Sequence, residues 1–291
     1  MYKMSVFLSP YFRFTRLFLE QPENLIFNST NWKSVLAKHK KYLTALILLI
    51  FLSNCATLSR TPLEPLNEQE AAAIISGIEA QDKMVSSLYT YGSLEIGKWA
   101  WESDLNILIA GTKYPLKIKI EITHPWGKPV LYILIIENRL RVLSFSEKKL
   151  YMGPFSAVTL AKFFPGEFDP NLIWTAFRKY PSLLSYHKVL SLKANQISLF
   201  NEEDKQIETI DFYPESLLPK RVSFSAQKTA LIFLDFKEEN GIIHAGEVRA
   251  VRVKGLKKMV LKSKKTVFNK TIPDQVFTLK KPPAFETVYI N

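Results

Sequence analysis

Short segments in which apolar and polar residues alternate recur along most of the chain, and they constrain its fold more than any other feature. In YPLKIKIEIT the two faces carry Leu116, Ile118, Ile120 and Ile122 on one side and Lys117, Lys119 and Glu121 on the other. A period of two indicates a β-strand with one buried face. Segments of this kind number near a dozen, and a sheet of that size must curl. We therefore predict a mainly β fold with helices (α+β): an open, incomplete antiparallel β-barrel of about eleven strands.

Three segments carry a helical pattern instead. Residues 68–88 place apolar side chains near one face after Asn67, a residue typical of a helix N-cap. Two shorter helices are expected at Ser156–Phe164 and Pro170–Lys179, inserted in the middle of the sheet. These helices are expected to cover the open side of the barrel. The pattern leaves open whether the interior is a cavity or a filled core.

The stretch THPWGKP, Thr123–Pro129, lies between two expected strands and is therefore predicted to be a hairpin tip. A tip usually carries small polar residues, yet this one carries Trp126. Two interpretations remain open for its side chain. Either the ring packs back onto the rim of the barrel, or it enters a membrane interface, where tryptophan is favoured.

The N-terminal region has the features of an export signal. Three lysines, Lys38, Lys40 and Lys41, precede an apolar run of about 11 residues, Tyr42–Leu52. A helix that spans a bilayer needs about 20 apolar residues, so the run suits the hydrophobic part of a signal peptide. We assign residues 1–54 to a signal peptide with an unusual N-terminal extension, 55–66 to a tether with two prolines, and 67–291 to the folded domain.

The run ends on Leu52-Ser53-Asn54-Cys55, which resembles the lipobox of bacterial lipoproteins. Asn54 departs from that pattern, which prefers a smaller residue. Cys55 is the only cysteine of the chain, so no disulfide or multi-cysteine metal site can form within it. The resemblance implies that Cys55 carries covalent lipid and becomes the first residue of the mature protein.

The sequence offers little that suggests catalysis. It contains no paired histidines at metal-ligand spacing, no nucleophile elbow and no phosphate-binding loop. We therefore expect no enzymatic activity, no metal and no cofactor beyond the lipid on Cys55.

A basic stretch between residues 249 and 270 accounts for much of the formal charge of +12. It is either a solvated sheet face or a surface that attracts anionic lipid headgroups. Nucleic acid is not an expected partner, because an exported lipoprotein rarely meets it.

Several of these segments together resemble the LolB outer-membrane lipoprotein receptor in order and spacing. They are LYTYGSLEI, the alternating strand, THPWGKPVLYI, ENRLRVLS, KKLYMG and the helical segment ending IWTAFRKYP; the later IPDQVFTLKKPP is similar to the closing strand of the wider LolA/LolB superfamily. The resemblance covers Glu68 to Pro283, although the half after Ser185 is longer than in the compact receptor. It implies an open barrel lidded by helices, with an apolar cavity for the acyl chains of lipoproteins.

The same resemblance implies the residues of the site. In the family, a loop between two strands carries a protruding apolar residue needed for membrane insertion. That loop matches Pro125, Trp126 and Gly127, with Trp126 in place of a leucine and His124 in place of an asparagine. The implied cavity lining is aliphatic and comes from two strands: Leu116, Ile118, Ile120, Ile122, Leu131 and Ile133.

The resemblance also implies partners and a location. The protein would receive acylated lipoproteins from a periplasmic LolA-like carrier and help to insert them into the outer membrane, to which it is anchored facing the periplasm. Two alternatives stay open. The same fold can serve as a carrier or binding module for another lipid, such as a glycolipid, or as an envelope-assembly scaffold with a filled interior.

Overall fold

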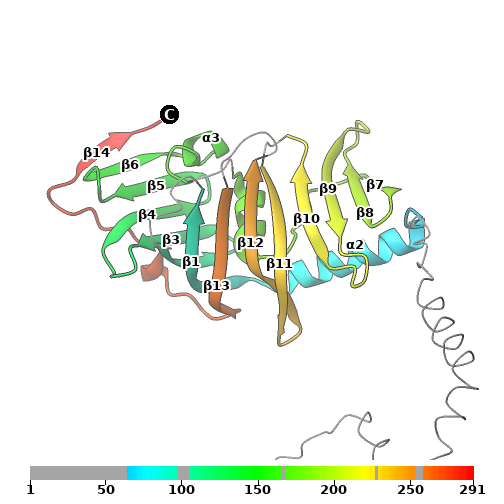
Figure 1. Cartoon of the computed structure of the whole chain (residues 1–291). Helices are drawn as coiled ribbons and strands as arrows, with labels where there is room; N and C mark the ends of the chain where they lie inside the picture. Colours follow the sequence, from blue (N-terminus) through cyan, green and yellow to red (C-terminus); the bar gives the residue numbers. More distant parts are fainter. Residues whose placement is uncertain (1–63, 98–104, 165–167, 227–228, 253–257) are drawn as a thin grey trace, which may run out of the picture. The chain divides into compact units, whose positions relative to one another are not determined.

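The computed structural model describes residues 64–97, 105–164, 168–226, 229–252 and 258–291. They form one sheet of 14 strands in the order β14-β6-β5-β4-β3-β2-β1-β13-β12-β11-β10-β9-β8-β7 (Figure 1). The strands are β1 Ser87–Ile96, β2 Leu105–Thr112, β3 Lys117–Thr123, β4 Pro129–Ile136, β5 Arg139–Ser144, β6 Lys149–Pro154, β7 Lys188–Lys193, β8 Gln196–Phe200, β9 Gln206–Phe212, β10 Pro219–Phe224, β11 Thr229–Glu239, β12 Ile242–Arg252, β13 Lys258–Phe268 and β14 Glu286–Tyr289.

The sheet consists of two antiparallel meanders, β1–β6 and β7–β13, joined where β1 pairs with β13. Its outermost strands, β14 and β7, lie at opposite ends of this order, which confirms a mainly β fold with an open sheet. The number of about eleven strands was wrong. The antiparallel prediction also fails at one edge, where β14 pairs with β6 in parallel. Because β14 is short and its partner is remote in sequence, its alternation gave no signal of this pairing.

The helices begin at the predicted residue or one residue later, and all three are shorter than predicted. Helix α2, Glu68–Lys83, is capped by Asn67, whose side chain accepts a hydrogen bond from the backbone N–H of Glu70. It ends five residues before the predicted limit, because Leu88 is buried in β1 instead. Helix α3, Ala157–Leu160, is a single turn capped by Ser156. Helix α4, Pro170–Arg178, is capped by Asp169 at its start and is followed by the C-cap residue Lys179, whose φ is 61°.

The sheet has one face that carries the main core. The alternation predicted for β3 is confirmed, since Ile118, Ile120 and Ile122 are at most 2% exposed. They belong to one hydrophobic cluster that also includes residues of the second meander, of α2 and of α4. In Figure 1, α4 lies behind β12, on the side of the sheet opposite to the viewer. We call this side the inner face.

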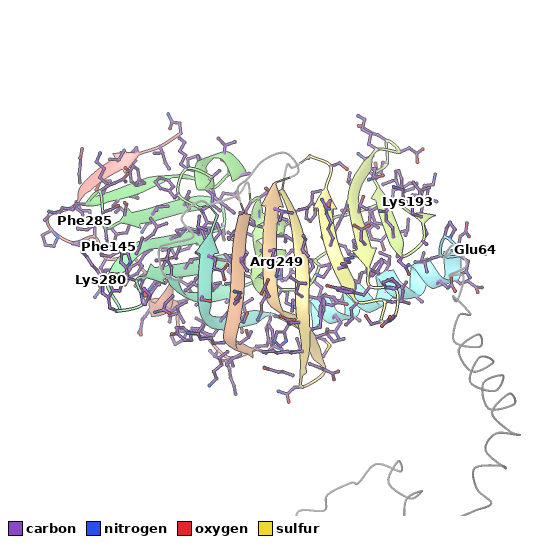
Figure 2. All side chains as sticks on the ribbon, in the orientation of Figure 1. Glu64, Phe145, Lys193, Arg249, Lys280 and Phe285 are labelled. Atoms are coloured by element: carbon purple, nitrogen blue, oxygen red, sulfur yellow. The ribbon has the colours of Figure 1, made fainter. Side chains whose placement is uncertain are left out.

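The C-terminal segment covers part of the outer face. Phe277, in the short 3-10 helix η2 Asp274–Phe277, packs on Ala110 of β2 and Leu134 of β4. The sequence PVLYILIIEN predicts a strand covered on both sides, and this contact confirms it for β4. Further along, Phe285 lies beside Phe145, with ring centroids 5.6 Å apart (Figure 2). The segment therefore crosses the outer face of the first meander before it adds β14 to the edge.

The pairing of β1 with β13 depends on a glycine. The register of these strands shifts at Gly92, and a Cβ placed there would lie 2.0 Å from the backbone oxygen of Lys262. Gly92→Ala is therefore expected to lower the free energy of unfolding by about 1–3 kcal/mol, measured by urea denaturation. Gly77→Ala is the matched control, since a Cβ at this helical position meets nothing within 4 Å. It should stabilise the protein slightly; an equal loss in both variants would contradict the steric explanation.

Candidate lipid-contact site

The predicted hairpin tip is a tight turn between β3 and β4. The backbone N–H of His124 donates to the oxygen of Lys128 at 2.8 Å, and that of Gly127 donates to the oxygen of His124 at 2.8 Å. Gly127 has a φ of 86°, a conformation that favours glycine. The two strands and these hydrogen bonds hold the tip in a defined shape.

Trp126 projects from this turn and is 70% exposed. Its ring stacks on that of His124, with centroids 4.6 Å apart and an interplanar angle of 4°. Such exposure is inconsistent with a ring packed back on the rim of the sheet, which was one of the two interpretations of the sequence. The isoleucines of β3 beside it point into the core, so Trp126 presents apolar surface that the fold itself does not use.

The residues predicted to line a cavity lie on the inner face but in a packed environment. Ile133 is fully buried, as are the three isoleucines of β3, whereas Leu116 and Leu131 are half-buried at the margin of the same cluster. Gly111, opposite Ile118 in β2, leaves room for the ring of Trp174 from α4. In this structure α4 therefore occupies the space in front of the predicted lining.

Helix α4 is buried on all sides, whereas the sequence pattern had led us to expect an outer cover. Each residue from Leu172 to Arg178 is buried, including Trp174 and Phe177. No local signal marks this burial, because Asn171, Thr175 and Arg178 recur at i, i+4 and i+7, as on the polar face of a surface helix. We call α4 the plug helix.

The C-terminal end of the plug helix carries two buried basic side chains. The Arg178 guanidinium donates to the backbone oxygens of Ile243 at 2.8 Å and Gln81 at 3.0 Å, which ties α4 to β12 and α2. The Lys179 ammonium donates to Ser263 Oγ at 2.9 Å and to Thr266 Oγ1. Burial lowers the pKa of Lys179 to about 7. The polar end of the plug is thus fixed by hydrogen bonds that replace those of water.

Three polar atoms at the plug have no hydrogen-bond partner among the described residues: Trp174 Nε1, Arg178 Nε and His244 Nδ1. An unpaired buried polar atom costs about 1–3 kcal/mol. Burial also lowers the pKa of His244 to about 4, so its ring is neutral at pH 7. The surroundings of the plug helix are therefore well packed, but some of their buried polar atoms lack a hydrogen bond.

The basic stretch lies partly on the outer face, where several of its cations have partners. The guanidinium of Arg249, in the middle of the sheet in Figure 2, pairs with Glu247, and the ammonium of Lys262 pairs with Glu95. The ammonium of Lys264 lies 5.5 Å from the ring centre of Tyr91. In the described part of the basic stretch, several side chains on the outer face of the sheet are therefore already paired with carboxylates or an aromatic ring.

Other predictions fall outside the described residues. Cys55, the signal peptide 1–54 and most of the tether 55–66 belong to this group, so the lipidation of Cys55 stays a prediction. Among the helices that the structure describes, none is long and apolar enough to cross a bilayer. The described residues also contain no group of three or more His, Cys, Asp or Glu placed to hold a metal ion.

Comparison with known proteins gives a fold but no family. No protein-family model matches the sequence, and no curated protein matches it significantly. The chain is similar to the solved structure of a DUF1329 family protein from Desulfovibrio piger, with a TM-score of 0.51 and 12% identity over 72% of this chain and 97% of that one. At this identity the likeness establishes a shared fold and no more.

Two further solved structures are similar at lower scores. One is a LolA superfamily protein from Nitrosomonas europaea, with a TM-score of 0.47 and 14% identity; the other is an outer membrane lipoprotein-sorting protein domain from Vibrio parahaemolyticus, with a TM-score of 0.46 and 13% identity. In both cases the alignment covers 72% of this chain and 97% of the other.

Proposed function

We propose that this protein is a lipid-anchored envelope protein that binds the acyl chains of lipoproteins and helps to insert them into the outer membrane. The observation that carries the proposal is the exposed Trp126 on a rigid hairpin tip, at the position where the LolB-like resemblance expects an apolar probe. Lipid on Cys55 would supply the anchor. The partners would be acylated lipoproteins and a periplasmic LolA-like carrier.

Trp126 is better suited to local contact than to anchoring. Full burial of a tryptophan removes about 200 Å² from water, worth about 5 kcal/mol at about 25 cal/mol per Å². Acyl chains on Cys55, at about 0.8 kcal/mol per buried methylene, would exceed this several-fold. The tip would therefore act where an acyl chain passes between protein and bilayer.

Binding of an acyl chain on the inner face requires movement of the plug helix, because Trp174 and its neighbours fill that space. Three buried polar atoms around the plug helix have no hydrogen bond to lose when the helix moves. Its displacement therefore costs less than that of a helix whose buried polar atoms are all hydrogen-bonded. Leu116, Ile118, Ile120, Ile122, Leu131 and Ile133 would then line the space that the helix vacates.

The filled inner face is also the specific observation that favours a second candidate, an envelope-assembly scaffold without a lipid ligand. Titration of the purified full-length protein with a fluorescent fatty acid separates the two. Saturable binding, competed by a lipoprotein acyl chain, supports the carrier and inserter. A protein that stays unliganded under conditions where a LolA carrier binds the same probe supports the scaffold. Competition by a glycolipid alone would indicate a carrier of that other lipid.

Trp126→Ser tests the role of the tip. The variant should retain its stability and membrane attachment, because the ring is exposed and the anchor lies elsewhere. Transfer of a labelled lipoprotein from its carrier to vesicles should slow at least about tenfold, the equivalent of about 1.4 kcal/mol. Tyr289→Ser, which removes a side chain that is 79% exposed on β14, serves as the control. Equal transfer by both variants and by the unmodified protein would refute the role.

A further inference from the structure

Three separate segments meet at one end of the first meander. Because β3, β4, β5 and β6 are antiparallel neighbours, the tip 123–129 and the β5–β6 turn 145–148 lie at the same end of their strands, and the β4–β5 turn lies at the other. The C-terminal segment 280–286 reaches the same end, since the backbone N–H of Glu286 donates to the oxygen of Lys148 at 3.1 Å. We call these three segments together the basic end.

Aromatic rings from all three segments lie at the basic end. The backbone N–H of Phe145 donates at 3.1 Å to the oxygen of Val130, which follows the tip directly in β4. The ring of Phe145 contacts that of Phe285, and both side chains are half-buried. Figure 2 shows these two residues and Lys280 at the same end of the meander. Together with the exposed ring of Trp126, they give this end an aromatic surface.

The same segments are rich in free positive charge. Their exposed lysines are Lys128, Lys148, Lys280 and Lys281. Among the described residues, none of these four ammonium groups forms an ion pair. The three segments contain two carboxylates, those of Glu147 and Glu286, and the first already accepts a hydrogen bond from the Tyr151 hydroxyl at 2.7 Å. The basic end therefore carries a net positive charge.

This distribution differs from that of the basic stretch 249–270, which the sequence offered as a surface for anionic lipid headgroups. There, the charges of Arg249 and Lys262 are offset by Glu247 and Glu95. An exposed ammonium without a carboxylate partner keeps its charge available to an external anion. The attraction expected from the sequence is therefore stronger at the basic end than on the outer face of β12 and β13.

The two kinds of side chain at the basic end match the two layers of a bilayer surface. An indole ring is favoured at the boundary between headgroups and acyl chains. A lysine keeps its aliphatic stem along apolar surface while its ammonium reaches the phosphates. Apolar contact and electrostatic attraction to anionic lipid reinforce each other in surface binding. The combination of an exposed tryptophan with unpaired lysines therefore fits a membrane that contains anionic lipid.

We propose that the basic end docks this protein onto an anionic phospholipid bilayer, with its lysines on the lipid phosphates and Trp126 at the interface. The role of Trp126 rests on the proposed function, whereas the selection of anionic lipid by the lysines goes beyond it. The attraction of each lysine falls off within a Debye length, so the docking should depend strongly on salt.

The test is co-flotation of the full-length Cys55→Ser protein with phosphatidylcholine vesicles that contain or lack phosphatidylglycerol. The substitution removes the predicted lipid anchor, so the docking contact itself is measured. Phosphatidylglycerol should tighten binding at least about tenfold. This preference should vanish at about 1 M salt, where the Debye length is about 3 Å. Equal binding to both kinds of vesicle would overturn the proposal and would assign the lysines to an acidic protein instead.

Charge variants locate the docking surface. The test variant combines Lys128→Gln, Lys148→Gln and Lys280→Gln. The matched control combines three exposed positions of the basic stretch, Lys264→Gln, Lys265→Gln and Lys270→Gln. The test variant should lose at least about tenfold in affinity for the phosphatidylglycerol vesicles, and the control at most about twofold. An equal loss in both would mean that net charge alone attracts the protein, which would overturn the proposal.

A single labelled cysteine reports the orientation on the bilayer. Cys55 is the only cysteine, so Ser146→Cys in the Cys55→Ser chain places one nitrobenzoxadiazole dye on the exposed β5–β6 turn. Its emission should rise and shift to the blue with phosphatidylglycerol vesicles. Asn138→Cys, in the exposed β4–β5 turn at the opposite end, is the control and should not respond. An equal response from Asn138→Cys would contradict docking through the basic end. Neither measurement includes a lipoprotein or a fatty acid, so docking and acyl-chain binding can fail independently.

Discussion

Replacement of Trp174 by alanine should lower the free energy of unfolding by about 3–5 kcal/mol, because it removes a large buried ring from the plug helix. The side chain is 3% exposed and packs against the inner face near Gly111 and Ile118. Urea denaturation followed by circular dichroism measures the loss. Trp126→Ala is the matched control, since the same truncation at an exposed tip should change stability by at most about 0.5 kcal/mol.

Trp174→Ala also bears on the proposed function. The space left by the Trp174 ring lies within the hydrophobic cluster of the inner face, and an apolar cavity accepts apolar guests. A fluorescent fatty acid should therefore bind Trp174→Ala more tightly than the unmodified protein, and should restore part of the lost stability. Unchanged stability would show that the plug helix is not part of the core. A large loss without tighter binding would favour the scaffold.

The second large effect concerns Glu208, a buried carboxyl group on β9. Burial raises its pKa to about 7, although the hydrogen bond from the backbone N–H of Leu184 acts in the opposite direction. Its Oε1 is buried without a hydrogen-bond partner among the described residues. The folded protein therefore holds the proton of Glu208 to a higher pH than the unfolded chain does.

The sign of the pH dependence follows from this difference. Between the unfolded pKa of about 4.5 and the folded pKa of about 7, only the folded state keeps the proton, so stability falls as the pH rises through this window. Above pH 7 Glu208 is ionised in both states, and the cost of ionising it in the folded protein lowers the free energy of unfolding by at most on the order of 3 kcal/mol.

Glu208→Gln imitates the protonated side chain and keeps an acceptor for Leu184. At pH 8 it should be more stable than the unmodified protein by up to about 3 kcal/mol, and at pH 5 the difference should shrink to a small part of that. Urea denaturation at several pH values gives both numbers. A difference that does not vary with pH would mean that Glu208 ionises as an ordinary exposed carboxyl group.

The sequence predicted most of the strands because half-buried strands leave a period of two. Ile118, Ile120 and Ile122 illustrate this, and the turn chemistry around Gly127 predicted the hairpin tip correctly. Asn67 likewise predicted the start of α2. These signals are local: each depends on residues within a few positions of one another.

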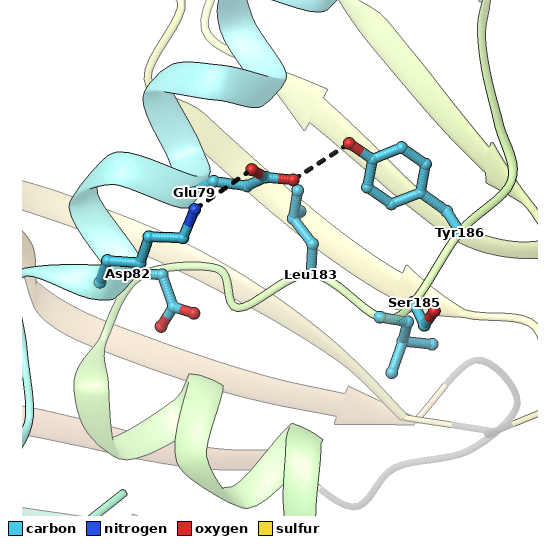
Figure 3. A pocket seen from close by; sticks show the side chains of 7 residues that line it. Glu79, Asp82, Leu183, Ser185 and Tyr186 are labelled. Atoms are coloured by element: carbon cyan, nitrogen blue, oxygen red, sulfur yellow. Dashed lines mark hydrogen bonds and ion pairs between the residues drawn. The ribbon is translucent and has the colours of Figure 1, made fainter.

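The remaining features depend on contacts between distant residues. Leu88 suits the apolar face of a helix and the inner face of a strand equally well, so only its pairing in β1 decides between them. The edge strand β14 depends on β6, and the burial of α4 depends on both meanders. The hydroxyl of Tyr186 donates to Glu79 of α2 from a segment about 100 residues later (Figure 3), and no spacing in the sequence indicates that contact.

The junction of β1 with β13 has a consequence for the order in which the fold can form. Within each meander, neighbouring strands follow one another along the chain and can pair early, because the loops to be closed are short. The junction instead pairs residues far apart in the sequence, such as Leu88 with Phe268. The edge pair of β6 with β14 likewise can form only after the last part of the chain has been made. During synthesis from the N-terminus, the first meander therefore exposes the edge of β1 until β13 arrives. An exposed strand edge is a site for wrong pairing, so we expect the slowest and most aggregation-prone stage of folding to end when β13 docks.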